Sequence, residues 1–199
     1  MIDQYETIDG IAESKLVVKK SRFIGVATST ESLESVEAFL CFVQTRCPGA
    51  THYCYAYKIK LVNQLFEYAD DAGEPRNSAG LPILSVLRDS GFSNVTCIVV
   101  RYYGGAKLGV GGLIRAYSKC AQNCLSVANR KTEILYSELQ VQVGYGQVGT
   151  LFKLLGRFNG ELIGVDYNEI IDVKFKMRQQ GVQHFQRRLD AMNLVAEEM

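Results

Sequence analysis

The chain has 199 residues, of which 47% are hydrophobic and 22% are charged, and its formal net charge is +1. This composition is typical of a folded globular protein, and it excludes both a disordered chain and a polycation that coats nucleic acid through bulk charge. No apolar run approaches the ~18 residues that a membrane span needs, and the first residues are acidic where a signal peptide would be basic. We therefore expect a cytoplasmic protein with no membrane partner.

Hydrophobic periodicity predicts alternating strands and helices in the first part of the chain. The expected strands cover residues 16–28, 52–60, 63–68 and 95–100. The expected helices cover residues 31–44, a short segment with Pro82 in its first turn and Gly91 just past its end, and residues 113–129. Ser29 or Thr30 is the expected N-cap of the first helix. In the strand at 52–60, three tyrosines alternate with His52 and Cys54, so the two sets should face opposite sides of a sheet.

The pattern changes after residue 132. Strands are expected at residues 138–145, 160–167 and 170–177, with the start of another at 194–195, and helices at 148–158 and 182–192. This order is that of a ferredoxin-like domain. We therefore predict an α+β protein of two domains, residues 1–134 and 135–199, with the boundary between residues 132 and 137.

Six cysteines are present, but no Cys-x-x-Cys pair and no histidine spacing suggests a zinc site. Several cysteines lie in apolar runs, as Cys97 does, and buried reduced thiols are the expected state in the cytoplasm. We predict no metal and no cofactor.

A glycine-rich segment lies directly between the buried strand and the helix expected from residue 113. Between residues 75 and 132 the chain has eight basic residues and one acid, and Arg115 and Lys119 share one helix face. Glycines before a helix start let the backbone approach an anion, whereas the dinucleotide and P-loop motifs do not fit. The segment therefore has two possible interpretations, an anion-binding site or a turn whose glycines are needed only for packing. The candidates for binding an anion or nucleic acid are Arg101, Tyr102, Gly104, Gly105, Lys107, Gly109, Gly111, Gly112, Arg115 and Lys119.

The second dense feature is the acidic segment that begins at Asp70. Its three carboxylates could bind Mg²⁺, act as acid and base, or solvate a turn. We expect His52, Asp71 and Glu74 to lie on one surface near the glycine loop, although a strand histidine beside tyrosines is more often structural. No nucleophile–base pair can be assigned.

Four segments together resemble the IMPACT (YigZ) family. The longest is VVRYYGGAKLGVGGLIRAY at residues 99–117, and SRFI at 21–24, ATHYCYAY at 50–57 and DAGEPRNSAGLPIL at 71–84 agree in order. The chain departs from the family pattern at Ala72, where a second aspartate is usual, and at residues 76–78, where Arg-Asn-Ser replaces Ser-Gly-Thr.

The resemblance implies a first domain folded like domain 2 of ribosomal protein S5, followed by a ferredoxin-like domain, an arrangement similar to domains four and five of elongation factor G. Eukaryotic relatives of the first domain regulate translation by competing for a protein partner, but they carry a different accessory domain that is absent from this sequence, so that partner is not carried over. The family implies no catalytic residue. We expect a non-enzymatic binding module associated with translation, with RNA or the ribosome as partner. The alternatives are a nucleotide- or phosphate-dependent enzyme that uses the glycine loop, and a regulator that binds another protein.

Overall fold

The computed structural model describes residues 3–60 and 64–199, which divide into two units. One unit runs from Glu6 to Glu133, and the other combines residues 134–199 with the start of the chain up to Tyr5. The sequence-based division assigned those first residues to the N-terminal domain. Each unit is built around its own cluster of buried apolar side chains.

The N-terminal unit contains a sheet whose described strands run in the order β2-β3-β6-β4-β5. Their bounds are β2 (Ile11–Val18), β3 (Ser21–Ser29), β4 (His52–Lys60), β5 (Leu65–Asp70) and β6 (Val95–Tyr102). All neighbouring pairs are antiparallel. The central strand β6 is buried along almost its whole length, which explains its continuous apolar sequence. The expected first residue of the β5 strand, Asn63, lies outside the described residues.

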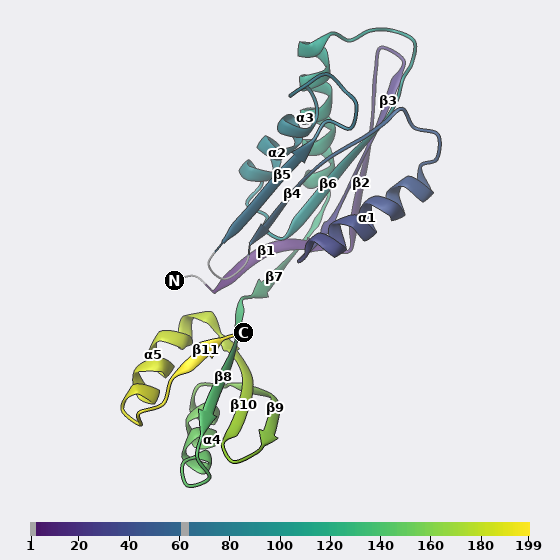
Figure 1. The fold of residues 1–199 in the computed structure, drawn as a ribbon. Helices are drawn as coiled ribbons and strands as arrows, with labels where there is room; N and C mark the ends of the chain where they lie inside the picture. Colours follow the sequence, from purple (N-terminus) through teal and green to yellow (C-terminus); the bar gives the residue numbers. More distant parts are fainter. Residues whose placement is uncertain (1–2, 61–63) are drawn as a thin grey trace. The chain divides into compact units, whose positions relative to one another are not determined.

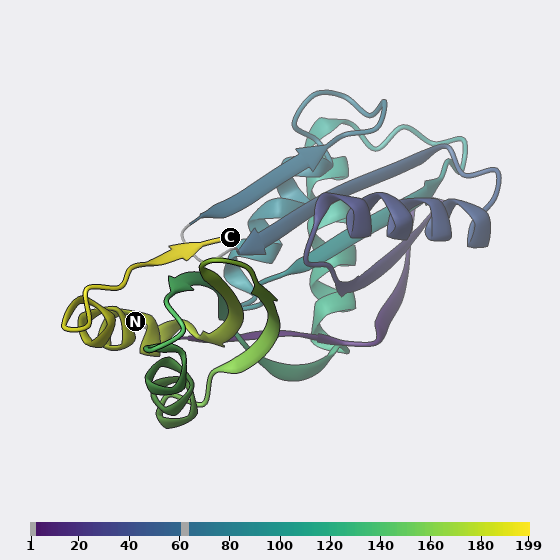
Figure 2. The same cartoon turned by 60° about the horizontal axis from the view of Figure 1, so that its bottom comes forward.

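Helices cover both faces of this sheet. Helices α2 (Gly80–Asp89) and α3 (Val110–Ser126) pack on one face, and α1 (Leu33–Arg46) lies on the other (Figures 1 and 2). The predicted alternation of β4 is confirmed, because Cys54 and Ala56 join the core under α2 and α3 while Tyr53 and Tyr55 pack on the α1 side.

The predicted single strand at residues 16–28 is wrong, because the chain turns at Lys19 and Lys20 to form the β2–β3 hairpin. Both lysines have positive φ, 45° and 68°, as the two central residues of a type I′ hairpin turn require. Glycine or asparagine usually signals such a turn in a sequence, and because two lysines stand here the turn was not predicted. Gly104 packs tightly against this turn, because a Cβ at Gly104 would lie 2.1 Å from the Lys20 carbonyl group.

Helix boundaries also differ from those expected. The N-cap of α1 is Ser32, not Ser29 or Thr30, and Ser32 and Ser35 form a reciprocal capping box. Helix α3 begins at Val110, before the expected residue 113, because its first turn accommodates two glycines. The strands β1 (Gln4–Asp9) and β7 (Asn129–Ile134), which pair with each other, were not predicted.

The C-terminal unit has the strand–helix–strand–strand–helix–strand order that the sequence predicted. Its elements are β8 (Tyr136–Val143), α4 (Val148–Arg157), β9 (Glu161–Tyr167), β10 (Ile171–Arg178), α5 (Gln179–Asp190) and β11 (Ala196–Glu198). The sheet order is β11-β8-β10-β9, and every pair is antiparallel. This is the ferredoxin-like topology, so the predicted α+β class is confirmed.

Among the described helices, none is both long and apolar enough to span a membrane.

The separate cores predict that the N-terminal unit folds without the C-terminal one. Residues 6–133 produced alone should unfold in one cooperative thermal transition, measured by circular dichroism, with the whole chain as reference. A fragment that shows no cooperative transition would contradict the division.

Candidate functional site

The carboxylate of Asp71 caps helix α2. One of its oxygens accepts hydrogen bonds from the backbone N–H groups of Ala79 (2.9 Å) and Gly80 (2.8 Å), and the other accepts from Asn77 (2.6 Å). Ala79 is the N-cap residue and has no side chain that could serve this role. The side chain of Asp71 therefore serves as the cap of α2, although Asp71 lies eight residues before the N-cap residue.

The backbone of the acidic loop packs tightly around this cap. A Cβ at Gly80 would lie 2.7 Å from the backbone of Asp70, so only glycine fits there. The Asp70 carboxylate accepts a 2.7 Å hydrogen bond from the N–H of Ala72, whose φ is +44°. Ala72 thus adopts the left-handed conformation, which aspartate tolerates better than alanine does.

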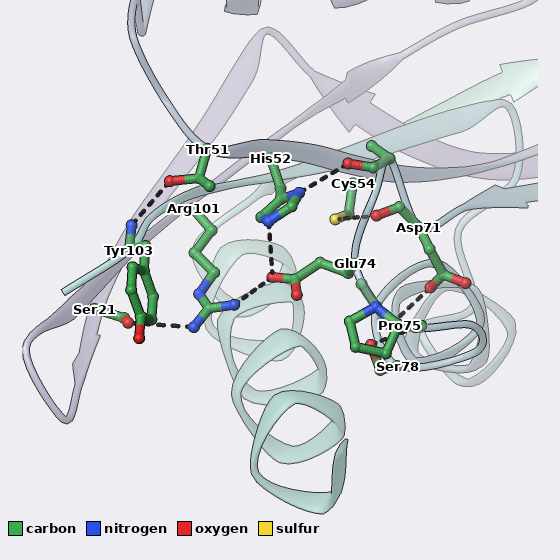
Figure 3. A network of polar contacts seen from close by, with 12 residues as sticks. Ser21, Thr51, His52, Cys54, Asp71, Glu74, Pro75, Ser78, Arg101 and Tyr103 are labelled. Atoms are coloured by element: carbon green, nitrogen blue, oxygen red, sulfur yellow. Dashed lines mark hydrogen bonds and ion pairs between the residues drawn. The ribbon is translucent and has the colours of Figure 1, made fainter. Parts of the chain in front are cut away.

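Glu74 is the centre of a buried polar network at the end of the sheet (Figure 3). Its Oε1 accepts hydrogen bonds from Nη1 of Arg101 at 2.5 Å and from the hydroxyl of Tyr117 at 2.8 Å. The side chains of Glu74 and Arg101 are only 3% and 6% exposed. Because each buried charge is matched by the other, the pairing offsets part of the free-energy cost of removing both charges from water. We call Glu74, Arg101, Tyr117 and His52 the Glu74 network.

Arg101 is held by further contacts inside the protein. Its Nη2 lies 3.4 Å from the hydroxyl of Ser21, and its guanidinium lies 5.4 Å from the ring centre of Tyr103 and 5.5 Å from that of Phe23. The hydroxyl of Ser21 also accepts a hydrogen bond from the N–H of Gly104. The sequence grouped Arg101 with exposed cations, whereas the structure places it in the interior, where Glu74 neutralises its charge.

His52 joins this network from strand β4. Its Nδ1 lies 2.9 Å from the carbonyl oxygen of Ala72, and its Nε2 lies 3.9 Å from Oε1 of Glu74. A carbonyl oxygen only accepts, so Nδ1 carries the proton in this contact. His52 and Glu74 thus lie close together, but the Glu74 side chain is buried and the Asp71 carboxylate turns away toward α2.

The remaining reactive groups of this region are held protonated. The thiol of Cys54 lies 3.0 Å from the carbonyl oxygen of Asp71 and 3.3 Å from the hydroxyl of Tyr117. Burial raises the pKa of the Cys54 thiol to about 12, and burial also raises the pKa of Tyr117 well above its usual range. A thiol that stays protonated at neutral pH is a poor nucleophile. The arrangement favours a structural role for these groups.

The glycine loop ends at the start of helix α3. Gly105 and Gly109 have positive φ values of 83° and 72°, and Gly109 is the N-cap residue, with no side-chain cap in the described part of the chain. The first N–H groups of α3 are therefore uncapped by any side chain, and a helix N-terminus of this kind favours anions. Lys107 is exposed within the loop.

A groove of about 610 Å³ lies between strand β2 and helix α3. Its apolar lining includes Leu16, Val18, Leu108, Ile114 and Ala116. Its polar lining is Lys19, Arg115, Ser118, Lys119 and Gln122, and Gly112 completes the wall. The lining of the groove thus combines apolar side chains with three cations and contains no acidic residue. We call it the β2–α3 groove.

The structure brings only some of the predicted anion-binding candidates to this groove. Arg115, Lys119 and Gly112 line it, and Lys107 lies in the preceding loop. Tyr102 belongs to the opposite face of the sheet, where its ring lies under the guanidinium of Arg22. The sequence analysis missed Lys19 and the apolar residues of β2 because it did not locate the hairpin turn that brings them next to α3.

Comparisons with known proteins agree with this architecture. The family model described as the Impact N-terminal domain matches residues 19–125. The IMPACT family member YigZ of Escherichia coli (strain K12) is 34% identical over 174 residues, which cover 86% of this chain and 85% of that protein. An IMPACT family member of Thermus thermophilus is 40% identical over 139 residues, 70% of this chain and 74% of its own.

A solved structure described as a crystal structure of a hypothetical protein is also similar. It has a TM-score of 0.77 and 28% sequence identity, and the match covers 100% of this chain and 98% of the other.

The Glu74 network predicts a large stability loss when one charge is removed. Arg101→Met should lower the free energy of unfolding by about 3–5 kcal/mol, because it leaves the Glu74 carboxylate buried without a counter-charge. Urea unfolding measures the change, and Arg22→Met is the matched control, since its guanidinium lies over the ring of Tyr102 rather than in a buried ion pair. A loss below ~1 kcal/mol for Arg101→Met, within the range of ordinary surface substitutions, would contradict the argument.

Proposed function

Because the chain belongs to the IMPACT family, we propose that it is a non-enzymatic, translation-associated binding protein that holds single-stranded RNA in the β2–α3 groove. The observation that carries the proposal is the composition of this groove, which combines cations with apolar side chains next to a helix N-terminus. Single-stranded nucleic acid offers both phosphates and flat base surfaces, and proteins that bind it combine positive charge with apolar contacts.

The positions of the cations support binding to a chain of phosphates. Arg115 and Lys119 lie one turn apart on α3, and Lys19 of the β2–β3 turn also lines the groove. Lys107 extends the positive surface into the glycine loop. Because the net charge of the whole chain is only +1, attraction to RNA depends on this local cluster.

The acidic loop argues against the enzymatic alternative. Asp71 caps α2, Glu74 is paired with Arg101, and the thiol of Cys54 is held protonated. These groups are occupied by structural contacts, so they are poorly placed to act as acid, base or nucleophile.

The link to translation rests on the family. The resemblance includes eukaryotic relatives that regulate translation and a domain arrangement similar to that of a ribosomal elongation factor. We propose the ribosome as the place where this chain meets RNA, in the cytoplasm.

Removing two cations from the groove tests the proposal. The double variant Arg115→Ala/Lys119→Ala should bind a fluorescent 12-nucleotide single-stranded RNA roughly tenfold or more weakly near 0.1 M salt, because two phosphate contacts are lost. The slope of log K against log salt should fall in magnitude by about 1.4, at about 0.7 for each contact with a single strand. Fluorescence anisotropy over a salt series measures both.

The matched control is Lys153→Ala/Arg157→Ala, which removes two exposed cations at the same spacing from helix α4. It should retain the affinity and the salt slope of the unmodified chain. The proposal fails if the unmodified chain binds no RNA at low salt, or if the two double variants lose affinity equally. Binding that requires a nucleoside triphosphate would instead favour the enzyme.

A further inference from the structure

A row of aromatic side chains lies on the face of the N-terminal sheet that carries α1. Tyr55 and Tyr57 come from β4 and Phe66 and Tyr68 from β5, and the strand register places Tyr57 opposite Tyr68. The rings of Tyr57 and Tyr68 are stacked with centres 5.6 Å apart, and the Tyr55 and Tyr68 ring centres are 6.0 Å apart. We call these four residues the aromatic row.

The aromatic row is accessible to solvent. Phe66 and Tyr68 are 44% and 46% exposed, although large aromatic side chains are usually buried. Helix α1 packs on this face against β3, β6 and the Tyr53 and Tyr55 side chains of β4, and in Figure 1 it lies on the side of the sheet away from β5. Tyr68 therefore joins the half-buried tyrosines of β4 to the solvent-exposed side of β5.

Strand β5 is also an edge of the sheet. In the described part of the chain its strand neighbour is β4 alone, so one side of its backbone is not paired within the sheet. An exposed edge strand is a template for an added strand from another chain. Because side chains of a strand alternate between faces, every second residue of an added strand would lie beside the aromatic row.

The charges around the row favour a cationic ligand. Asp70 on β5 lies directly opposite Tyr55 in the strand register, and the charge of Glu37 on α1 also acts on Tyr55. Burial, followed by Asp70, the neighbouring tyrosines and Glu37, raises the pKa of Tyr55 to about 12. Lys58 and Lys60, the cations of β4, alternate with the tyrosines and so belong to the other face. Phosphates would be repelled here, whereas guanidinium groups are attracted by carboxylates and stack on tyrosine rings.

We propose that β5 and the aromatic row bind an extended segment of a protein partner that carries arginine at alternate positions. The segment adds a strand to the edge of β5, and its arginine side chains stack on Tyr68 and Tyr57 and approach Glu37 and Asp70. This surface lies on the face of the sheet opposite to α2 and α3, so it is independent of the β2–α3 groove.

A set of synthetic peptides tests the ligand chemistry. The probe is a fluorescent (Thr-Arg)₄ peptide, and the comparison peptides are (Thr-Glu)₄ and Thr₄-Arg₄, which has the same composition without the alternation. The whole chain should bind (Thr-Arg)₄ at least tenfold more tightly than either comparison peptide. Equal binding of (Thr-Arg)₄ and Thr₄-Arg₄ would overturn the proposal, because it would show attraction by charge alone.

Matched substitutions test the surface. Tyr68→Ser should weaken binding of (Thr-Arg)₄ at least tenfold, and Phe66→Ser provides a second variant if the first one unfolds. The control is Tyr167→Ser, which removes a tyrosine that is 65% exposed on the edge strand β9 of the other sheet. Unchanged binding by a folded Tyr68→Ser or Phe66→Ser protein would overturn the proposal.

Two further outcomes identify a different occupant. Self-association in sedimentation experiments that Tyr68→Ser abolishes would show that a second copy of the chain covers the row, and it would overturn the assignment to a partner. Displacement of (Thr-Arg)₄ by the 12-nucleotide RNA from the chain with an intact groove, but not from Arg115→Ala/Lys119→Ala, would show competition at the groove and would likewise overturn it.

Discussion

The ion pair between Glu74 and Arg101 determines how the N-terminal unit is arranged at one end of its sheet. Glu74 comes from the loop after β5, Arg101 from the central strand β6 and Tyr117 from α3, so one carboxylate connects three parts of the fold. Burial of two charges costs several kcal/mol unless they are paired and hydrogen-bonded. The pairing therefore favours the one position of the loop in which Glu74 meets Arg101.

The fixed loop in turn positions the two features that flank the proposed RNA site. On one side it places Asp71 to cap α2. On the other side Arg101 contacts the hydroxyl of Ser21, and this hydroxyl accepts a hydrogen bond from the N–H of Gly104. Gly104 in turn packs against the backbone of the Lys19–Lys20 turn. The buried network therefore contributes to the groove without lining it, because it holds the hairpin turn that carries Lys19.

The sequence predicted the parts of this structure that depend on local pattern. The tyrosine alternation in β4, the continuous apolar run of β6 and the element order of the C-terminal unit are periodic features, and the structure confirms them. The β2–β3 turn was missed because two lysines adopt the left-handed conformation without a glycine or asparagine to signal it.

The candidate site was harder to predict than the fold, because it depends on contacts between distant residues. Arg101 and Glu74 are 27 residues apart, and no periodicity indicates that they pair. The sequence consequently treated a buried, neutralised arginine as a surface cation. It grouped Arg115 and Lys119 because they are four residues apart on one helix, whereas Lys19 reaches the same groove from a distant strand.

The two proposed surfaces lie on opposite faces of the N-terminal sheet. Three cations line the β2–α3 groove on the side of α3, and Asp70 and Glu37 lie beside the aromatic row on the side of α1. Because the sheet lies between these surfaces, a polyanion and a basic peptide can bind at the same time without sharing a contact. A particle made of RNA and arginine-rich protein offers both ligands together, and two weak contacts held by one particle reinforce each other through their effective concentration. A ribonucleoprotein surface would therefore offer a ligand to the β2–α3 groove and to the aromatic row at once.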